Sequence, residues 1–191
     1  MPFFKLLLGF APWLAFLFIA HGSLIRLDIG LGAALALTVL TGVLGLSRGI
    51  IFWCSMVFFA AASVAVIGFH SMWTVGNMGI LASGTLAACT WLGILLRRPF
   101  TLAYAKAQVP PEHWSDPLFL RINYILSAAW GAVFTANALL AAISKYGPPL
   151  GEWMHQSVSY GLLIGASLFT SWYPEHAKRA AGGGRKPRPS S

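Results

Sequence analysis

Five side chains between residues 119 and 143 are the strongest candidates for a binding site. Asn123, Ser127, Trp130, Phe134 and Asn137 follow one another at intervals of four, three, four and three residues. This spacing places all five on one face of a helix. The pattern allows two interpretations, because such a face either packs inside a helical bundle through hydrogen bonds between helices or lines a polar cavity or partner groove.

Three histidines form a second candidate site. His21, His70 and His155 fall near the ends of three apolar stretches, at the side of the chain that carries few basic residues. Imidazole is a common ligand of metal ions and haem iron. However, no two of these residues form a chelating pair on one helix, so metal or haem binding is the minor alternative and no cofactor is expected.

Catalysis finds little support in the apolar stretches. No Asp, Glu, Lys or Arg lies in the middle of any of them, although proton-coupled carriers usually need an ionisable group at that depth. Paired carboxylates for acid–base chemistry are missing for the same reason. No serine or cysteine nucleophile is matched to a base by a motif. We therefore expect a protein that is not an enzyme and has no catalytic residues.

These candidates must be positioned by membrane helices. The 191-residue chain is 57% hydrophobic and 9% charged, whereas soluble domains have about 25% charged residues. A helix needs about 20 apolar residues to cross a bilayer. The sequence predicts an all-α, polytopic bundle over residues 1–176, with six transmembrane helices at about 3–20, 29–46, 50–68, 77–96, 119–143 and 154–173.

The basic residues orient this predicted bundle. Alternating crossings leave only Arg26 and Lys145 on one side of the membrane. The positive-inside rule assigns the other side to the cytoplasm, so both termini are expected there. Membrane orientation also accounts for the net charge of +8 without a nucleic-acid partner. The cytoplasmic set is Lys5, Arg48, Arg97, Arg98, Lys106, Arg121, Lys178, Arg179, Arg185, Lys186 and Arg188.

Two segments are expected to lie in the cytoplasm outside the spans. Residues 97–117 carry Phe100 and Tyr104 at helical spacing, which predicts a short helix on the membrane surface, and Trp114 offers an anchor there. The next helix is expected to begin with Asp116 as its cap. Residues 177–191 are rich in Gly, Pro and basic side chains, which predicts a disordered tail.

The two cysteines and the small residues predict helix contacts. Cys54 and Cys89 fall in adjacent helices toward the cytoplasmic half. A disulfide is not expected on that reducing side, so both are interpreted as small apolar side chains. Close helix approach, within the chain or between two copies, is predicted where small residues recur every four positions, at Gly30, Ala34 and Thr38 and at Ser157, Gly161 and Gly165.

Several short motifs carry a family resemblance. They are Gly9-Phe10-Ala11-Pro12, Arg97-Arg98-Pro99, Val109-Pro110 followed by Trp114, and then Asn123, Trp130-Gly131, Phe134 and Asn137. With the helix order over residues 6–173, they resemble the intracellular septation protein A family of bacterial inner-membrane proteins or a sister family. The resemblance implies a non-enzymatic, multi-pass protein of the bacterial inner membrane, linked to cell division, septation or envelope maintenance.

The leading hypothesis is therefore an interaction or scaffold component of the envelope machinery. Its expected partners are membrane lipids, other inner-membrane envelope or division proteins and, as a further option, a second copy of the chain. The alternative is a small transporter or channel for a neutral or lipid-like solute, lined by Asn123, Ser127 and Asn137. Candidate partner or cavity residues are Arg97, Arg98, Pro99, Trp114, Asn123, Ser127, Trp130 and Asn137.

Overall fold

The computed structural model describes residues 9–20, 22–46, 49–107, 109–147 and 152–182. Within these ranges the chain consists of helices and turns without a strand, which confirms the predicted all-α class. The long elements are α2 (Ala11–Ile19), α3 (Leu24–Val43), α4 (Ile50–Ser63) continued by the π-helical turn η1 (Val64–Gly68), α6 (Met78–Leu95), α8 (Pro117–Tyr146) and α9 (Glu152–Gly182). The short elements are α5 (Met72–Gly76), α7 (Phe100–Lys106) and the 3-10 turn η2 (Pro111–His113).

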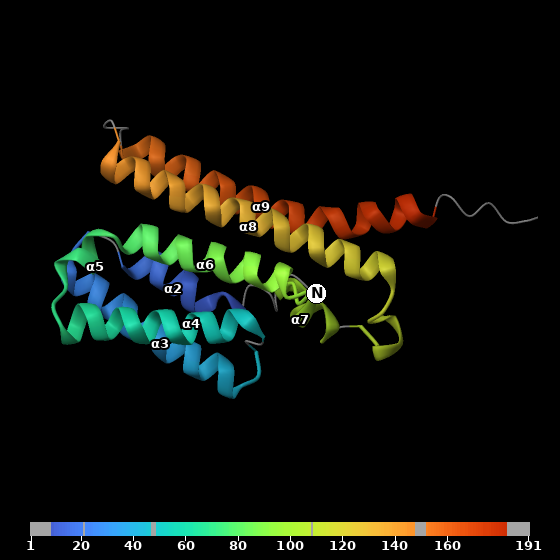
Figure 1. Cartoon of the computed structure of the whole chain (residues 1–191), viewed down its shortest axis with the longest axis horizontal. Coiled ribbons are helices and arrows are strands. Elements are labelled where there is room, and N and C mark those ends of the chain that lie inside the picture. The colour runs from blue at the N-terminus through green and yellow to red at the C-terminus, as the bar shows by residue number, and fades with distance from the viewer. Residues whose placement is uncertain (1–8, 21, 47–48, 108, 148–151, 183–191) are drawn as a thin grey trace, which may run out of the picture.

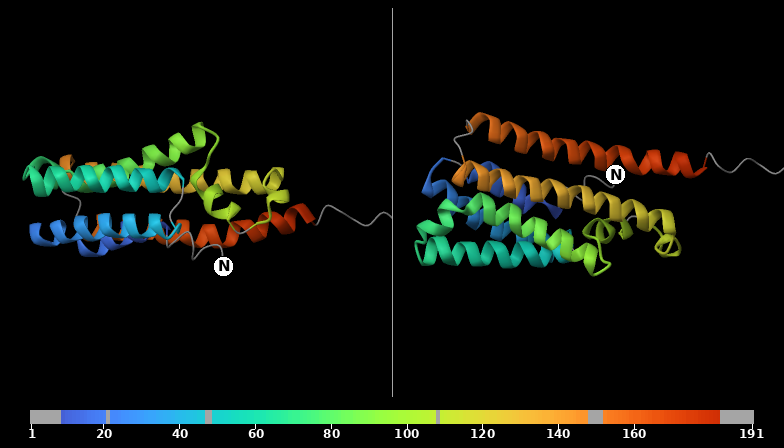
Figure 2. Two further views of the ribbon diagram at one scale, coloured as in Figure 1. Left: turned by 90° about the horizontal axis from the view of Figure 1, so that it is seen from below. Right: turned by 45° about the horizontal axis from the view of Figure 1, so that its top comes forward.

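Consecutive long helices run back and forth between the two ends of the molecule (Figure 1). The end of α2, the start of α3, α5, the end of α8 and the start of α9 lie at one end, and α7 and the start of α8 lie at the other. Neighbours in the chain pack on each other, as do α4 and α6, and α6 and α8. Figure 2 shows α2 and α3 on one side of the bundle and α4 and α6 on the other.

Four helices in the described part of the chain are long and apolar enough to cross a membrane: α3, α4 with η1, α6 and α8. Their outward faces carry large apolar side chains such as Val43, Trp53 and Leu95, as a lipid environment requires. These helices indicate a membrane protein. The predicted span 3–20 is described only from residue 9 onward, and the span 154–173 lies inside the longer helix α9.

The aromatic side chains of α2 fill the centre of the bundle. Trp13 stacks on Phe58 with 5.0 Å between ring centroids, and its ring lies 4.7 Å from that of Phe59. Its indole Nε1 donates a 2.7 Å hydrogen bond to Ser55 Oγ of α4. Because a buried indole N–H needs a partner, this bond fixes α2 against α4.

Helix termini and small residues behave largely as their chemistry predicts. Asp116 caps α8 by accepting a 2.8 Å bond from Leu118 N, with Pro117 in the first turn, which confirms that prediction. Gly30, Ala34 and Thr38 are buried on α3, and a Cβ on Gly30 would lie 2.9 Å from Ala20 Cβ. The close approach predicted for this stretch is confirmed.

The prediction of a surface helix in residues 97–117 is wrong. Phe100 and Tyr104 of α7 are only 2% and 5% exposed, and Phe100 makes an edge contact with Phe10 at 5.7 Å between centroids. The cause is the end of α6, where Arg97 takes a left-handed φ of 57°. Arg97 N bonds Ile94 O and Arg98 N bonds Gly93 O, a Schellman turn that sends Pro99 and α7 back into the bundle.

The predicted tail also begins too early. Helix α9 continues through Pro174 to Gly182, so residues 177–182 are helical, and residues 183–191 lie outside the described part of the chain. Residues 177–181, Ala-Lys-Arg-Ala-Ala, have high helix propensity. The exposed pair Glu175–Arg179, 3.7 Å apart at i,i+4, adds a small local contribution.

The expectation that the cysteines are reduced is wrong as well. Cys54 of α4 and Cys89 of α6 form a disulfide across 35 residues, with Cα atoms 6.6 Å apart. The expectation rested only on the reducing chemistry of the cytoplasm. It took no account of the antiparallel packing of α4 and α6, which places the two side chains opposite each other at bonding distance.

Candidate ligand-binding cavity

A large cavity lies between α2, α3, α6, α8 and α9. Its volume is about 650 Å³, within the range of about 300–1,000 Å³ that is usual for small-molecule sites. Aromatic rings from two helices form much of the wall: Phe10, Trp13 and Phe16 at α2, and Trp130 and Phe134 of α8. The remaining wall is mainly Leu, Ala, Val and Met, so the cavity suits an apolar occupant.

Few polar groups reach this cavity. No Asp, Glu, Lys, Arg or His among the described residues lines it, and the polar side chains that do are Ser23, Ser83, Asn137 and Ser167. Ser167 is satisfied within α9, because its Oγ donates to Leu163 O at 2.9 Å. Asn137 is 8% exposed, and its Oδ1 is buried without a hydrogen-bond partner in the described structure.

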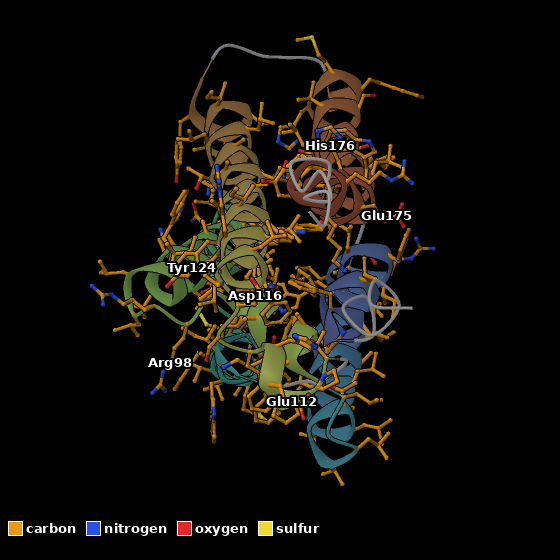
Figure 3. All side chains as sticks on the ribbon, turned by 90° about the vertical axis from the view of Figure 1, so that its right-hand side faces the viewer. Arg98, Glu112, Asp116, Tyr124, Glu175 and His176 are labelled. Carbon is orange, nitrogen blue, oxygen red and sulfur yellow. A yellow bond between two sulfur atoms is a disulfide. The ribbon has the colours of Figure 1, made fainter. Side chains whose placement is uncertain are left out.

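The cavity reaches the surface at the α2–α3 turn and along α9. Gly22, Ser23 and Leu24 line it and are exposed. Half-buried Leu17 of α2 and Leu163 of α9 line its side. Helix α9 packs chiefly on α8, and Figure 3 shows it standing over α2 when the bundle is seen end-on. Half-buried lining residues on both α2 and α9 therefore bring the cavity to the surface on the α2–α9 side.

The five-residue stripe of α8 is buried throughout, but it divides into two parts. Asn123 and Ser127 face α7, where Thr101 Oγ1 lies 2.9 Å from both Asn123 O and Ser127 Oγ. The Asn123 amide donates to Phe119 O at 2.8 Å. These two residues are packing groups and do not line the cavity. Trp130, Phe134 and Asn137 do line it.

Trp130 also connects the cavity wall to α9. Its Nε1 donates a 2.9 Å bond to Thr170 Oγ1, and its ring stacks on Phe10 with 5.9 Å between centroids. One indole of α8 therefore contacts both α9 and Phe10 at the start of α2. Its position holds α2, α8 and α9 in register.

The candidates in the 97–117 connection lie away from the cavity. Arg97 and Arg98 are exposed and Pro99 is buried at the start of α7, and Figure 3 shows Arg98 pointing away from the bundle. Trp114 donates from Nε1 to Val109 O at 2.9 Å, and Lys106 Nζ lies 5.1 Å from its ring centroid. This surface is basic and aromatic, as is usual where a helix end meets lipid head groups.

The histidines do not assemble into a metal site within the described residues. No group of three His, Cys, Asp or Glu side chains able to hold a metal ion occurs there. His70 is exposed with a φ of 50°, and His21 lies outside the described residues. His155 lines a separate hollow of about 150 Å³ together with Asn77 and Lys145.

Sequence reasoning missed the contribution of α2 to the site. Phe10, Trp13 and Phe16 recur every three residues, a spacing that places them on one helix face, yet this stretch reads equally as an ordinary membrane span. No sequence pattern marks Ser83 of α6 as a residue of the cavity wall.

Comparison of the chain with protein-family models, curated proteins and solved structures finds no match.

Proposed function

We propose that this protein is an integral membrane protein that binds a lipid-like, neutral solute in the cavity between α2, α3, α6, α8 and α9. The observation that carries the proposal is the volume of about 650 Å³ with aromatic and aliphatic walls and no charged lining residue. Burial of apolar surface contributes about 25 cal/mol per Å². An apolar occupant therefore gains affinity by burying its surface against these walls and needs no hydrogen bonds to them.

The solute enters from the bilayer in this proposal. Lipid-soluble molecules are concentrated in the membrane, and the half-buried Leu17 and Leu163 line the α2–α9 side of the cavity. A route between these helices needs no ionisable group. The exposed lining residues Gly22 and Ser23 at the α2–α3 turn supply a second route at the membrane surface, as a carrier or a lipid-presenting protein requires.

The proposed topology has six crossings, formed by α2, α3, α4, α6, α8 and α9, with both chain ends on the cytoplasmic side of a bacterial inner membrane. The alternating course of these helices supports it (Figure 1). Arg97 and Arg98 follow the end of α6, and Arg121 lies near the start of α8, at the end of the molecule that holds α7 (Figure 1). Lys145 lies in the last turn of α8, at the opposite end. This asymmetry agrees with the positive-inside rule.

The test is to fill the cavity. Ala82 lines it from α6, and Ala82→Phe would occupy part of its volume. Binding of tritiated hexadecyl methyl ether to the detergent-solubilised protein would be measured by scintillation proximity, with saturable binding expected for the wild type and a loss of at least about tenfold in affinity for Ala82→Phe. Ala88→Phe on the exposed face of the same helix is the matched control, and equal binding by both variants would contradict the proposal.

A second candidate function is the interaction or scaffold role in division, septation or envelope maintenance. One observation favours it: on α9, a Cβ added at Gly161 or Gly165 would meet nothing within 4 Å. Open small-residue faces allow a helix of another membrane protein to approach closely. Gly161→Leu/Gly165→Leu is expected to abolish in-membrane crosslinking to such a partner. Ile164→Leu, which keeps the size of a neighbouring exposed side chain, should leave it unchanged.

A further inference from the structure

Asn137 Oδ1 is one of a few buried side-chain atoms without a hydrogen-bond partner among the described residues, together with Ser63 Oγ, Thr90 Oγ1 and His155 Nε2, and of these four residues only Asn137 lines the cavity. The other two buried asparagines have no buried side-chain atom that lacks a partner: Asn77 Oδ1 accepts from Lys145 Nζ at 2.7 Å and from Tyr146 Oη at 2.8 Å, and the Asn123 amide donates to Phe119 O. Asn137 is 8% exposed, and its Oδ1 has no partner among the described residues. An unpaired buried acceptor is costly, which points to a partner that the cavity occupant supplies.

The packing register of α6 and α8 places a second polar group beside it. A Cβ on Gly79 would lie 3.6 Å from Ala141 Cβ, and one on Gly131 would lie 3.2 Å from Thr90 Cγ2. In this antiparallel pair, one turn onward from Gly79 and one turn back from Ala141 bring Ser83 to the level of Asn137. Both residues line the cavity, so an amide and a hydroxyl lie at the same level of the seam between α6 and α8.

The other lining residues of the cavity indicate which kind of molecule supplies the hydrogen-bond partner of Asn137. From Asn137, the α8 wall continues through Phe134 to Trp130. Phe10 packs on both of these rings, with 6.2 Å and 5.9 Å between centroids, and Trp13 also lines the cavity. A charged head group would meet no countercharge here, because the described lining residues are uncharged, and an unpaired ion is strongly disfavoured in such surroundings. The occupant therefore needs one neutral polar group and an apolar body.

Resting on the proposed function, we propose that the cavity selects a neutral lipid alcohol, with its hydroxyl at Asn137 and Ser83 and its hydrocarbon part against the α2 and α8 aromatics. A hydroxyl suits this seam because it donates one hydrogen bond and accepts others. It donates to Asn137 Oδ1 and accepts from the Asn137 amide N–H or from Ser83. An ether with the same hexadecyl chain keeps the apolar contacts but has no O–H to donate, so Oδ1 stays unpaired.

The experiment compares hexadecanol with hexadecyl methyl ether on the full-length, detergent-solubilised protein. The wild type is expected to bind the alcohol about tenfold more tightly than the ether, the effect of one buried hydrogen bond. Asn137→Leu is expected to remove this preference by weakening alcohol binding alone. Ser83→Ala is expected to reduce the preference in part, and Asn123→Leu, whose site lies outside the cavity, is expected to keep it.

Each outcome separates this inference from the proposed function. If the wild type binds alcohol and ether equally, or if Asn137→Leu weakens both ligands alike, the hydroxyl assignment is overturned while the cavity remains a binding site. If neither ligand binds the wild type saturably, the proposed function itself fails. The preference of the wild type needs no substitution, so misfolding of Asn137→Leu does not remove the test.

Discussion

The two halves of the inward face of α8 carry similar polar residues but differ in their hydrogen bonding. In the half next to α7, Thr101 Oγ1 bonds the Asn123 backbone carbonyl and the Ser127 hydroxyl, and the Asn123 amide donates to Phe119 O. In the other half, Asn137 is also buried, yet its Oδ1 has no partner in the described structure. The difference arises from the opposing element: α7 fills the space beside one half, and a cavity occupies the space beside the other.

The largest expected effect is loss of the crosslink between α4 and α6. Cys54→Ala/Cys89→Ala removes a disulfide that closes a loop of 35 residues, and such bonds typically stabilise by about 2–4 kcal/mol. Thermal unfolding in detergent should show a clearly lower Tm. The intact mass of the wild-type protein with and without reductant is the control, and an unchanged mass after reduction would mean that no disulfide forms.

The second largest effect is expected in the half of α8 next to α7. Thr101→Val keeps the side-chain shape but removes the hydroxyl that lies 2.9 Å from both Asn123 O and Ser127 Oγ. Leaving buried partners unpaired costs about 1–3 kcal/mol. The Tm is expected to fall, while affinity for hexadecyl methyl ether should stay within about twofold of wild type, because none of these residues lines the cavity.

A smaller effect is expected at the boundary between the two halves. Trp130→Phe keeps an aromatic cavity wall but loses the 2.9 Å bond to Thr170 of α9, a contribution of about 1 kcal/mol. Spin labels on the exposed residues Leu139 and Ile164 would report a broader α8–α9 distance distribution. An unchanged distribution would show that this bond does not hold α9.

The smallest effect on stability is expected at Asn137. Asn137→Leu exchanges an unpaired buried amide for an apolar side chain of similar size, which is close to neutral or stabilises by up to about 1 kcal/mol. The same substitution at Asn123 should destabilise, because Asn123 lies in the hydrogen-bonded half next to α7. A large loss of Tm for Asn137→Leu would remove the distinction between the two halves.

The helical layout was predictable because it depends on local properties. Apolar length predicted α3, α4, α6 and α8, and the Asp116 cap and the inward face of α8 followed from side-chain chemistry. The burial of α7 depends on the left-handed turn at Arg97. This conformation favours glycine, so an arginine at this position gives no sequence signal for the turn. The cavity and the Cys54–Cys89 bond arise from how distant helices pack, which no local pattern encodes.

The central claim is that the cavity holds a lipid-like molecule, and native mass spectrometry of the gently solubilised protein tests it most directly. Wild type and Ala88→Phe are expected to retain one neutral, apolar adduct from the membrane, and Ala82→Phe, whose side chain enters the cavity lined by Ala82, is expected to lose it. A bare wild-type chain, or the same adduct on Ala82→Phe, would contradict the account.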